Sequence, residues 1–183
     1  EKRTLKFSEI FGFGAGGMFT YGFQLMITGY YLLYYMTDIA GFSTVLAASL
    51  YSTIQIIKMV TMLFSGVIID AINFRSGKYR TWVLVSGIGL GLFFPLSFFY
   101  YPLPQSVYVV VFMIIYTLQT LFYNVGWTAM RAVIGKVAKN KADVVALNTS
   151  AQSAGTISSI LYGYIGYPIL GIALWAGTKQ AYG

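Results

Sequence analysis

Long apolar runs separated by short polar segments dominate the chain. Val83–Tyr101 is 19 residues without a charge, and Val107–Met130 is 24. An α-helix needs about 20 apolar residues to cross a bilayer, and the runs lack the residue-by-residue alternation of membrane β-barrels. The pattern therefore predicts five membrane-spanning helices, at residues 11–36, 44–69, 82–101, 107–131 and 144–172.

Polar residues recur at helical spacing in the first, second, fourth and fifth of these predicted helices. They are Thr20, Gln24, Thr28 and Tyr31; Tyr51, Gln55, Lys58 and Ser65; Tyr116, Gln119, Thr120, Tyr123, Asn124, Trp127, Thr128 and Arg131; and Asn148, Gln152, Thr156 and Ser159. One explanation is hydrogen bonding between helices, which contributes about 0.6 kcal/mol per contact. Because the stripes are long, we favour a water-filled cavity lined by these four helices. The third helix, with only Ser86 and Ser97, is expected outside it.

Lys58 stands near the middle of the second predicted helix. An ionised lysine at the bilayer centre costs at least about 2.5–3.5 kcal/mol, and a mid-helix side chain cannot easily reach the membrane surface. Asp38 and Asp70 lie at helix ends, and no acidic residue lies deep within a predicted helix. Lys58 is therefore expected either to pair with a carboxylate outside this sequence or to bind an anionic ligand. Arg131, near a helix end, is either an interfacial anchor or part of the cavity.

Composition agrees with a membrane protein and narrows its chemistry. Hydrophobic residues make up 57% of the chain and charged residues only 9%, whereas soluble domains carry about 25% charged residues. The absence of cysteine and histidine removes disulfides, thiol nucleophiles, histidine acid–base chemistry and most zinc sites. We expect no metal site, no cofactor and no enzymatic activity. The net charge is +7, but the basic residues stand between the apolar runs, so a nucleic-acid partner is not expected.

The basic residues also orient the predicted helices. Lys2, Arg3 and Lys6 precede the first helix. A second cluster, Arg75, Lys78 and Arg80, lies between helices two and three, and a third, Lys136, Lys139 and Lys141, lies between helices four and five. All fall on one side, which the positive-inside rule makes cytoplasmic. The N-terminus is predicted inside, in a cell (inner) membrane, and an odd helix count predicts a longer bundle.

A glycine-rich stretch opens the first predicted helix. Residues 12–17 satisfy G-x-G-x-x-G, but a dinucleotide site needs a preceding strand. Close helix packing through small residues is the better explanation, and we extend it to Gly87 and Gly91.

The segment between the second and third predicted helices carries a family pattern. Residues 66–82 read Gly-x-x-x-Asp and then Arg-x-Gly-Lys-Tyr-Arg-x-Trp. This loop resembles the signature loop of the major facilitator superfamily, in the form of the glycoside–pentoside–hexuronide:cation symporters. Segments Gly12–Ala15, Tyr34–Asp38 and Tyr123–Ala129 add to the resemblance.

The resemblance implies an all-α membrane protein of two six-helix halves, with substrate bound between them near the midplane. This chain would supply helices 1–5 of the N-terminal six-helix bundle and would lack the C-terminal half. The cation-site carboxylates of the family would fall at Lys58 and Met62, and a helix-four acid of one member near Asn124. The acid that the family uses on helix one and its arginine on helix five have no counterpart here.

These features predict a secondary transporter for a sugar or uronide, with an anionic solute favoured by Lys58, that works by alternating access in the lipid bilayer. Cation coupling is expected from the family, although the sodium-site carboxylates are missing. The expected substrate-binding residues are Gln24, Gln55, Lys58, Tyr123, Asn124, Trp127, Asn148 and Gln152, and the expected cytoplasmic gating residues are Asp70, Arg75, Lys78 and Arg80. The alternative is a non-transporting helical bundle that binds a lipid or a protein partner.

Overall fold

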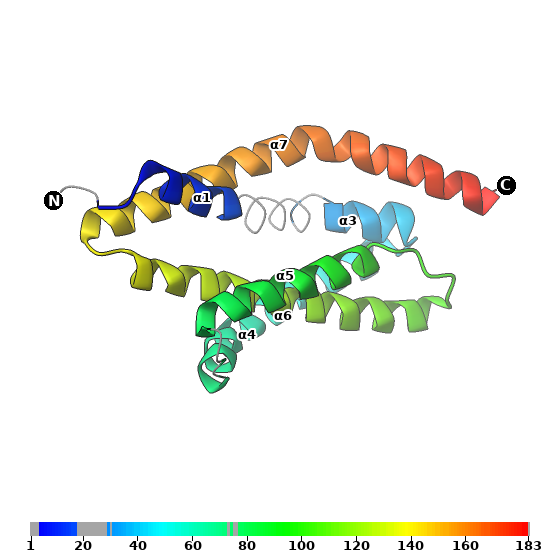
Figure 1. The fold of residues 1–183 in the computed structure, drawn as a ribbon. Coiled ribbons are helices and arrows are strands. Elements are labelled where there is room, and N and C mark those ends of the chain that lie inside the picture. The colour runs from blue at the N-terminus through cyan, green and yellow to red at the C-terminus, as the bar shows by residue number, and fades with distance from the viewer. Residues whose placement is uncertain (1–3, 18–28, 30, 73, 75–76, 183) are drawn as a thin grey trace. The chain divides into compact units, whose positions relative to one another are not determined.

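The computed structural model describes residues 4–17, 29, 31–72, 74 and 77–182, with side chains described up to residue 165. Every regular element in these ranges is helical, as expected (Figure 1). The elements are α1 (Phe7–Gly17), α3 (Leu32–Tyr34), the π-helix η3 (Tyr35–Ile39), α4 (Thr44–Ala71), α5 (Lys78–Ser97), α6 (Gln105–Val137) and α7 (Lys141–Tyr182). They form two units. Glu1–Tyr31 and Ala138–Gly183 make the first, which holds α1 and α7, and Leu32–Val137 makes the second.

Three helices in the described ranges are long and apolar enough to cross a membrane, namely α4, α5 and α6. They overlap the predicted spans 44–69, 82–101 and 107–131. α5 begins at Lys78, before the predicted start, because Gly77 with φ +101° ends the preceding loop and the charged residues form its first turn. Residues 18–28 of the first predicted span lie outside the described residues, and the fifth span falls within α7. The total of five spans stays a prediction.

In the second unit, α5 and α6 pack closely where small residues meet. A Cβ atom on Gly126 of α6 would lie 2.7 Å from Cβ of Ser86, and one on Gly89 of α5 would lie 2.4 Å from the Phe122 ring. The expected close approaches at Gly87 and Gly91 do not occur among the described residues of this unit, where a Cβ at either would meet nothing within 4 Å. The two residues are two positions from Gly89 and therefore point to other sides of the helix.

Aromatic side chains from η3, from α6 and from the segment before α4 meet at one end of the second unit. The hydroxyls of Tyr35 and Tyr108 lie 2.6 Å apart, and the Tyr35 hydroxyl donates to the Phe99 carbonyl at 2.9 Å. The rings of Phe42 and Phe112 pack around this pair. The buried phenols thus satisfy one another inside an otherwise apolar cluster.

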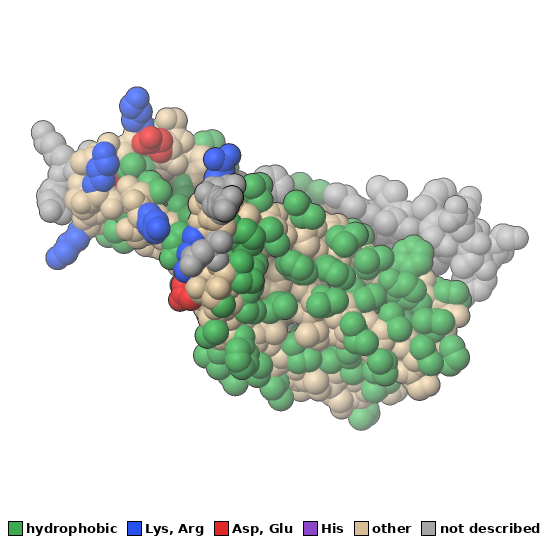
Figure 2. All heavy atoms as spheres, turned by 60° about the horizontal axis from the view of Figure 1, so that its bottom comes forward, with side chains coloured by type: hydrophobic (Ala, Val, Ile, Leu, Met, Phe, Trp, Pro, Cys, Tyr) green, Lys and Arg blue, Asp and Glu red, His purple; other side chains and the backbone are tan. Residues whose placement is uncertain are grey.

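The outer surface of the second unit is apolar. Figure 2 shows hydrophobic side chains spread over its visible face, and Leu63 and Ile88 are 72% and 73% exposed. Water would oppose such exposure, whereas lipid chains accept it. Together with three helices of spanning length, this surface identifies a membrane protein.

In the first unit, α1 packs on α7 through Gly14. A Cβ on Gly14 would overlap the Ser150 hydroxyl, which donates to the Ile10 carbonyl at 2.8 Å. The interpretation of residues 12–17 as a packing motif is confirmed at Gly14. Gly12 makes no such approach, since a Cβ there would meet nothing within 4 Å.

Gly126→Ala should destabilise the α5–α6 contact, because the added methyl meets a Cβ that is fixed to the backbone. Overpacking of this kind costs about 1–3 kcal/mol, which should lower the heat-denaturation midpoint of the purified protein. Gly135→Ala on the same helix is the matched control, since a Cβ there meets nothing within 4 Å. Equal midpoints for the two variants would contradict this packing.

Candidate functional site

Asn124 of α6 is the polar centre of the contact between α4 and α6. Its side chain is 6% exposed. Its Nδ2 donates to the Lys58 carbonyl at 3.1 Å and to Thr61 Oγ1 at 2.7 Å. A buried amide without partners is costly, so these two bonds fix the register of α6 against α4 at the level of Lys58.

Thr61 is the member of this group that sequence reasoning missed. Its hydroxyl donates within α4, to the Ile57 carbonyl at 2.8 Å and the Lys58 carbonyl at 3.1 Å, while accepting from Asn124. The sequence did carry a signal for Thr61, because it lies one helical turn after Lys58. The Lys58 carbonyl therefore receives two side-chain donors, one from each helix.

The Lys58 ammonium has no anionic partner among the described residues. It is half-buried and lies mid-way along α4. The four described acidic side chains are engaged elsewhere: Glu9 with the Lys6 amide, Asp38 with Thr37, Asp70 with Lys78, and Asp143 with Thr4. The structure thus leaves open both expected partners for Lys58, a carboxylate beyond this sequence and an anionic ligand.

Tyr123, Trp127 and Arg131 form a ladder along α6, each four residues from the next. The two rings are nearly parallel, 10° apart in tilt with centroids separated by 6.5 Å. The Arg131 guanidinium lies 4.6 Å from the Trp127 ring centroid, in cation–π contact. Arg131 therefore covers part of the ring that was expected to stack on a solute.

Several residues of the predicted polar stripes hold helices together instead of facing a cavity. Ser97 of α5 donates to Gln119 Oε1 at 2.7 Å, and the Ser65 and Thr128 hydroxyls lie 2.8 Å apart. Gln119 and Ser65 are fully buried. Hydrogen bonding between helices accounts for these positions, and Ser97, which sequence reasoning set aside, is part of it.

The remaining expected binding residues lie on α4, on α7 or outside the described residues. Gln55 is exposed on α4, one turn before Lys58. Asn148 and Gln152 are exposed on α7 of the first unit, where Asn148 Nδ2 donates to the Val144 carbonyl at 3.0 Å. Gln24 lies outside the described residues. The structure therefore brings together Lys58 and Asn124, with Thr61, and sets Tyr123 and Trp127 on the same helix as Asn124.

An ion pair links Asp70 and Lys78, two residues of the expected gating loop. Lys78 Nζ lies 2.7 Å from Asp70 Oδ1, with Lys78 23% and Asp70 75% exposed. Lys136 at the end of α6 places its ammonium 5.0 Å from the Tyr79 ring centroid. Arg80 is exposed, and Arg75 lies outside the described residues. An exposed pair contributes only about 0–1 kcal/mol, so it shapes the loop more than it stabilises the fold.

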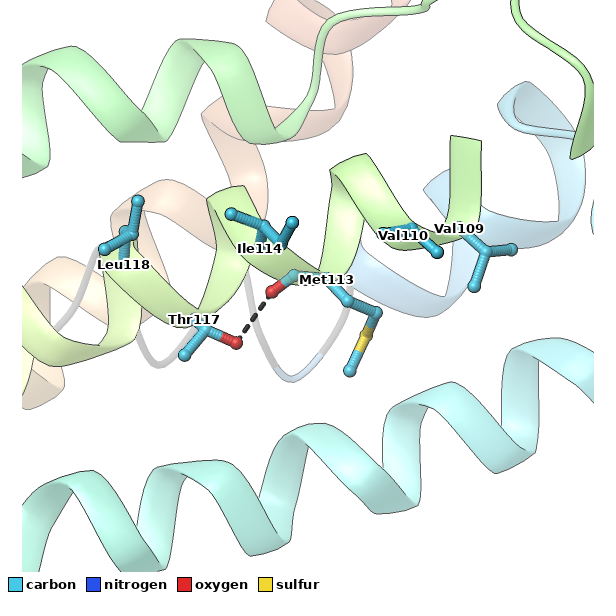
Figure 3. A pocket seen from close by; sticks show the side chains of 6 residues that line it. All are labelled: Val109, Val110, Met113, Ile114, Thr117 and Leu118. Carbon is cyan, nitrogen blue, oxygen red and sulfur yellow. Dashed lines mark hydrogen bonds between the residues drawn. The ribbon is translucent and has the colours of Figure 1, made fainter. Parts of the chain in front are cut away.

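A separate pocket on α6 lacks the chemistry of a polar site. Figure 3 shows its lining, which comes from one face of this helix: Val109, Val110, Met113, Ile114, Thr117 and Leu118. The Thr117 hydroxyl, the polar side-chain group among them, donates to the Met113 carbonyl at 2.6 Å. None of the expected binding residues belongs to this pocket.

The bond between Asn124 and Thr61 should be measurable as a coupling free energy. In a double-mutant cycle of Asn124→Leu and Thr61→Val, we expect about 0.6 kcal/mol of coupling in the unfolding free energy, the average for such bonds in membranes. Asn124→Leu with Thr117→Val is the control, because the Thr117 hydroxyl is bonded within α6. Coupling no larger than in the control would show that the bond is absent.

The sequence of the chain matches a known protein family. Residues 12–182 match the family described as "MFS/sugar transport protein". The chain is 23% identical to the isoprimeverose transporter of Lactiplantibacillus pentosus over 182 residues, covering all of this chain and 38% of that protein. It is 26% identical to the putative glycoside/cation symporter YagG of Escherichia coli over 157 residues, covering 84% of this chain and 34% of that protein.

A third relative is the glucuronide carrier protein homolog of Escherichia coli, 27% identical over 96 residues, which cover 52% of this chain and 21% of that protein. The chain therefore spans well under half the length of these relatives. No solved structure matches. The family match extends over nearly the whole chain, and the relatives agree with the resemblance seen in the loop at residues 66–82. The chain belongs to the major facilitator superfamily of multi-pass membrane transport proteins, in its sugar-transport family.

Proposed function

We propose that the protein to which this chain belongs is a secondary transporter for a sugar-like solute that carries a negative charge. The observation that carries the proposal is Lys58, a half-buried ammonium in the middle of α4 with no carboxylate partner among the described residues. A fixed charge at that depth is costly unless it meets an anion or water. A uronide or similar acidic sugar would supply the anion.

Two relatives support the sugar class by their names, an isoprimeverose transporter and a glucuronide carrier homolog. Isoprimeverose is neutral and glucuronides are acidic, so the two names leave the charge of the solute undecided. Lys58 is the feature that favours the acidic kind for this chain. The proposed hydrogen-bonding residues are Gln24, Gln55, Asn124, Asn148 and Gln152, and the proposed stacking surface is Tyr123 with Trp127.

We also propose that transport does not depend on sodium. The resemblance puts the carboxylates of the family's cation site at Lys58 and Met62, so an ammonium and a thioether replace two anionic ligands. The nearby oxygens are engaged as well, because the Lys58 carbonyl and Thr61 Oγ1 accept from the Asn124 amide. A sodium ion needs several oxygen ligands, and here a tethered cation takes the position that the ion has in the family.

The transport cycle follows from the two-half architecture of the superfamily. The halves would rock about the solute, with the N-terminus and the loop at Asp70–Arg80 on the cytoplasmic side of the cell (inner) membrane. In this cycle the Lys78–Asp70 pair would open and re-form, which its low stability permits.

Sodium independence is tested by uptake into membrane vesicles that contain the full-length protein. Uptake of a labelled uronide should be the same with an inward sodium gradient as with an equal potassium gradient, because Lys58 already supplies the positive charge. Strong stimulation by sodium would contradict the proposal.

The anion preference is tested by equilibrium binding of matched sugars and uronates. Lys58→Gln should weaken uronate binding roughly tenfold or more, since one charge-assisted contact is lost, and should change binding of the neutral sugar much less. Lys139→Gln removes an exposed charge from the loop before α7 and serves as the control. Loss of both ligands equally would argue against a counter-charge. No binding of any solute to the unaltered protein would favour the non-transporting alternative.

A further inference from the structure

Asp143 is a buried carboxylate that the proposed transport function does not use. It lies in the first turn of α7, just before the predicted span 144–172, and its side chain is 0% exposed. Buried carboxylates are rare unless they are well paired, so its partners indicate its role.

The partners come from two distant parts of the first unit. Oδ1 accepts from the backbone amides of Thr4 at 2.9 Å and Leu5 at 3.3 Å. Oδ2 accepts from the Thr4 hydroxyl and from the Lys139 amide at 3.4 Å. One carboxylate thus binds the segment that leads into α1 and the segment that leads into α7.

Capping of α7 alone does not explain these contacts. Asn140 already caps the helix, because its Oδ1 accepts from the Asp143 amide at 2.8 Å. The start of α1 is capped separately, by Glu9 Oε2 accepting from the Lys6 amide at 2.8 Å. The bonds from Thr4 and Leu5 to Asp143 are therefore additional, and they join one helix start to the other.

Hydrogen bonding also keeps this carboxylate charged. The Thr4 hydroxyl lowers the pKa of Asp143 most, and the amides of Thr4, Leu5 and Lys139 lower it further, against the opposing effect of desolvation. A pKa below the usual range leaves the group ionised at neutral pH, which preserves all four bonds under ordinary conditions.

We propose that Asp143 is a clamp that holds the chain entering α1 against the start of α7. The Gly14–Ser150 approach joins the same two helices further along. With both contacts in place, α1 and α7 keep one register and move as a pair. If the proposed transport function is correct, two helices predicted to line the solute path are coupled in this way at their cytoplasmic ends.

The test is single-residue hydrogen exchange on the full-length protein in lipid nanodiscs, without any solute. Asp143→Asn should speed exchange of the Thr4 and Leu5 amides by about tenfold, the effect of losing a hydrogen bond to a charged group. The Lys6 amide should be unchanged, because Glu9 holds it within α1. Asp38→Asn is the matched control, since it removes the same charge from an exposed aspartate.

Unchanged exchange at Thr4 and Leu5 in Asp143→Asn would overturn the clamp, as would an equal increase at Lys6, which would mean general fraying. If Asp143→Asn does not accumulate in membranes, Thr4→Val decides. It removes only the hydroxyl contact and should still speed exchange at Leu5, and no change there would overturn the proposal. Because the exchange experiment contains no solute, its result does not depend on transport. The clamp proposal can therefore be contradicted while the transport proposal holds, and the transport proposal can be contradicted while the clamp proposal holds.

Discussion

Polar groups inside a membrane need partners, and this constraint shapes the contact between α4 and α6. Asn124 meets it by donating to the Lys58 carbonyl and Thr61 Oγ1, and Ser65 and Thr128 repeat the solution nearby. These bonds set which faces of the two helices meet. The Lys58 ammonium, in contrast, is a mid-helix charge that no described acidic residue neutralises. The need for a partner therefore explains the helix packing and also points to Lys58 as the candidate site.

The chain shares its family with known sugar transporters, and the proposed difference from them lies in the chemistry of α4. The family match over residues 12–182 agrees with relatives that include a putative glycoside/cation symporter. Lys58 stands where the resemblance would place a carboxylate. In our proposal, a cation in place of an anionic site reverses the charge of the ligand that the site favours and removes the reason for binding a metal ion. One substitution on α4 therefore links the substrate proposal to the coupling proposal.

Sequence reasoning predicted the helical class and the spans that α4, α5 and α6 overlap, because apolar length and helical spacing are local properties. It singled out Lys58 and Asn124 as candidates, since a polar residue within an apolar helix is visible without a structure. It missed which partner each polar residue takes. Gly89 rather than Gly87 or Gly91 approaches α6, and Ser97 binds Gln119, because the crossing of two helices decides which side is covered. Asp143 and Thr4 are 139 residues apart, and no local pattern reveals their contact.

The central claim is that Lys58 faces a water-filled path rather than lipid. The 183 residues contain no cysteine, so Lys58→Cys can be probed with a membrane-impermeant thiol reagent, which reacts with thiolates in water. Leu63→Cys, at a position of α4 that is 72% exposed and apolar, is the lipid-facing comparison. We expect labelling of Lys58→Cys and no labelling of Leu63→Cys. No labelling of Lys58→Cys, or equal labelling of both, would contradict it.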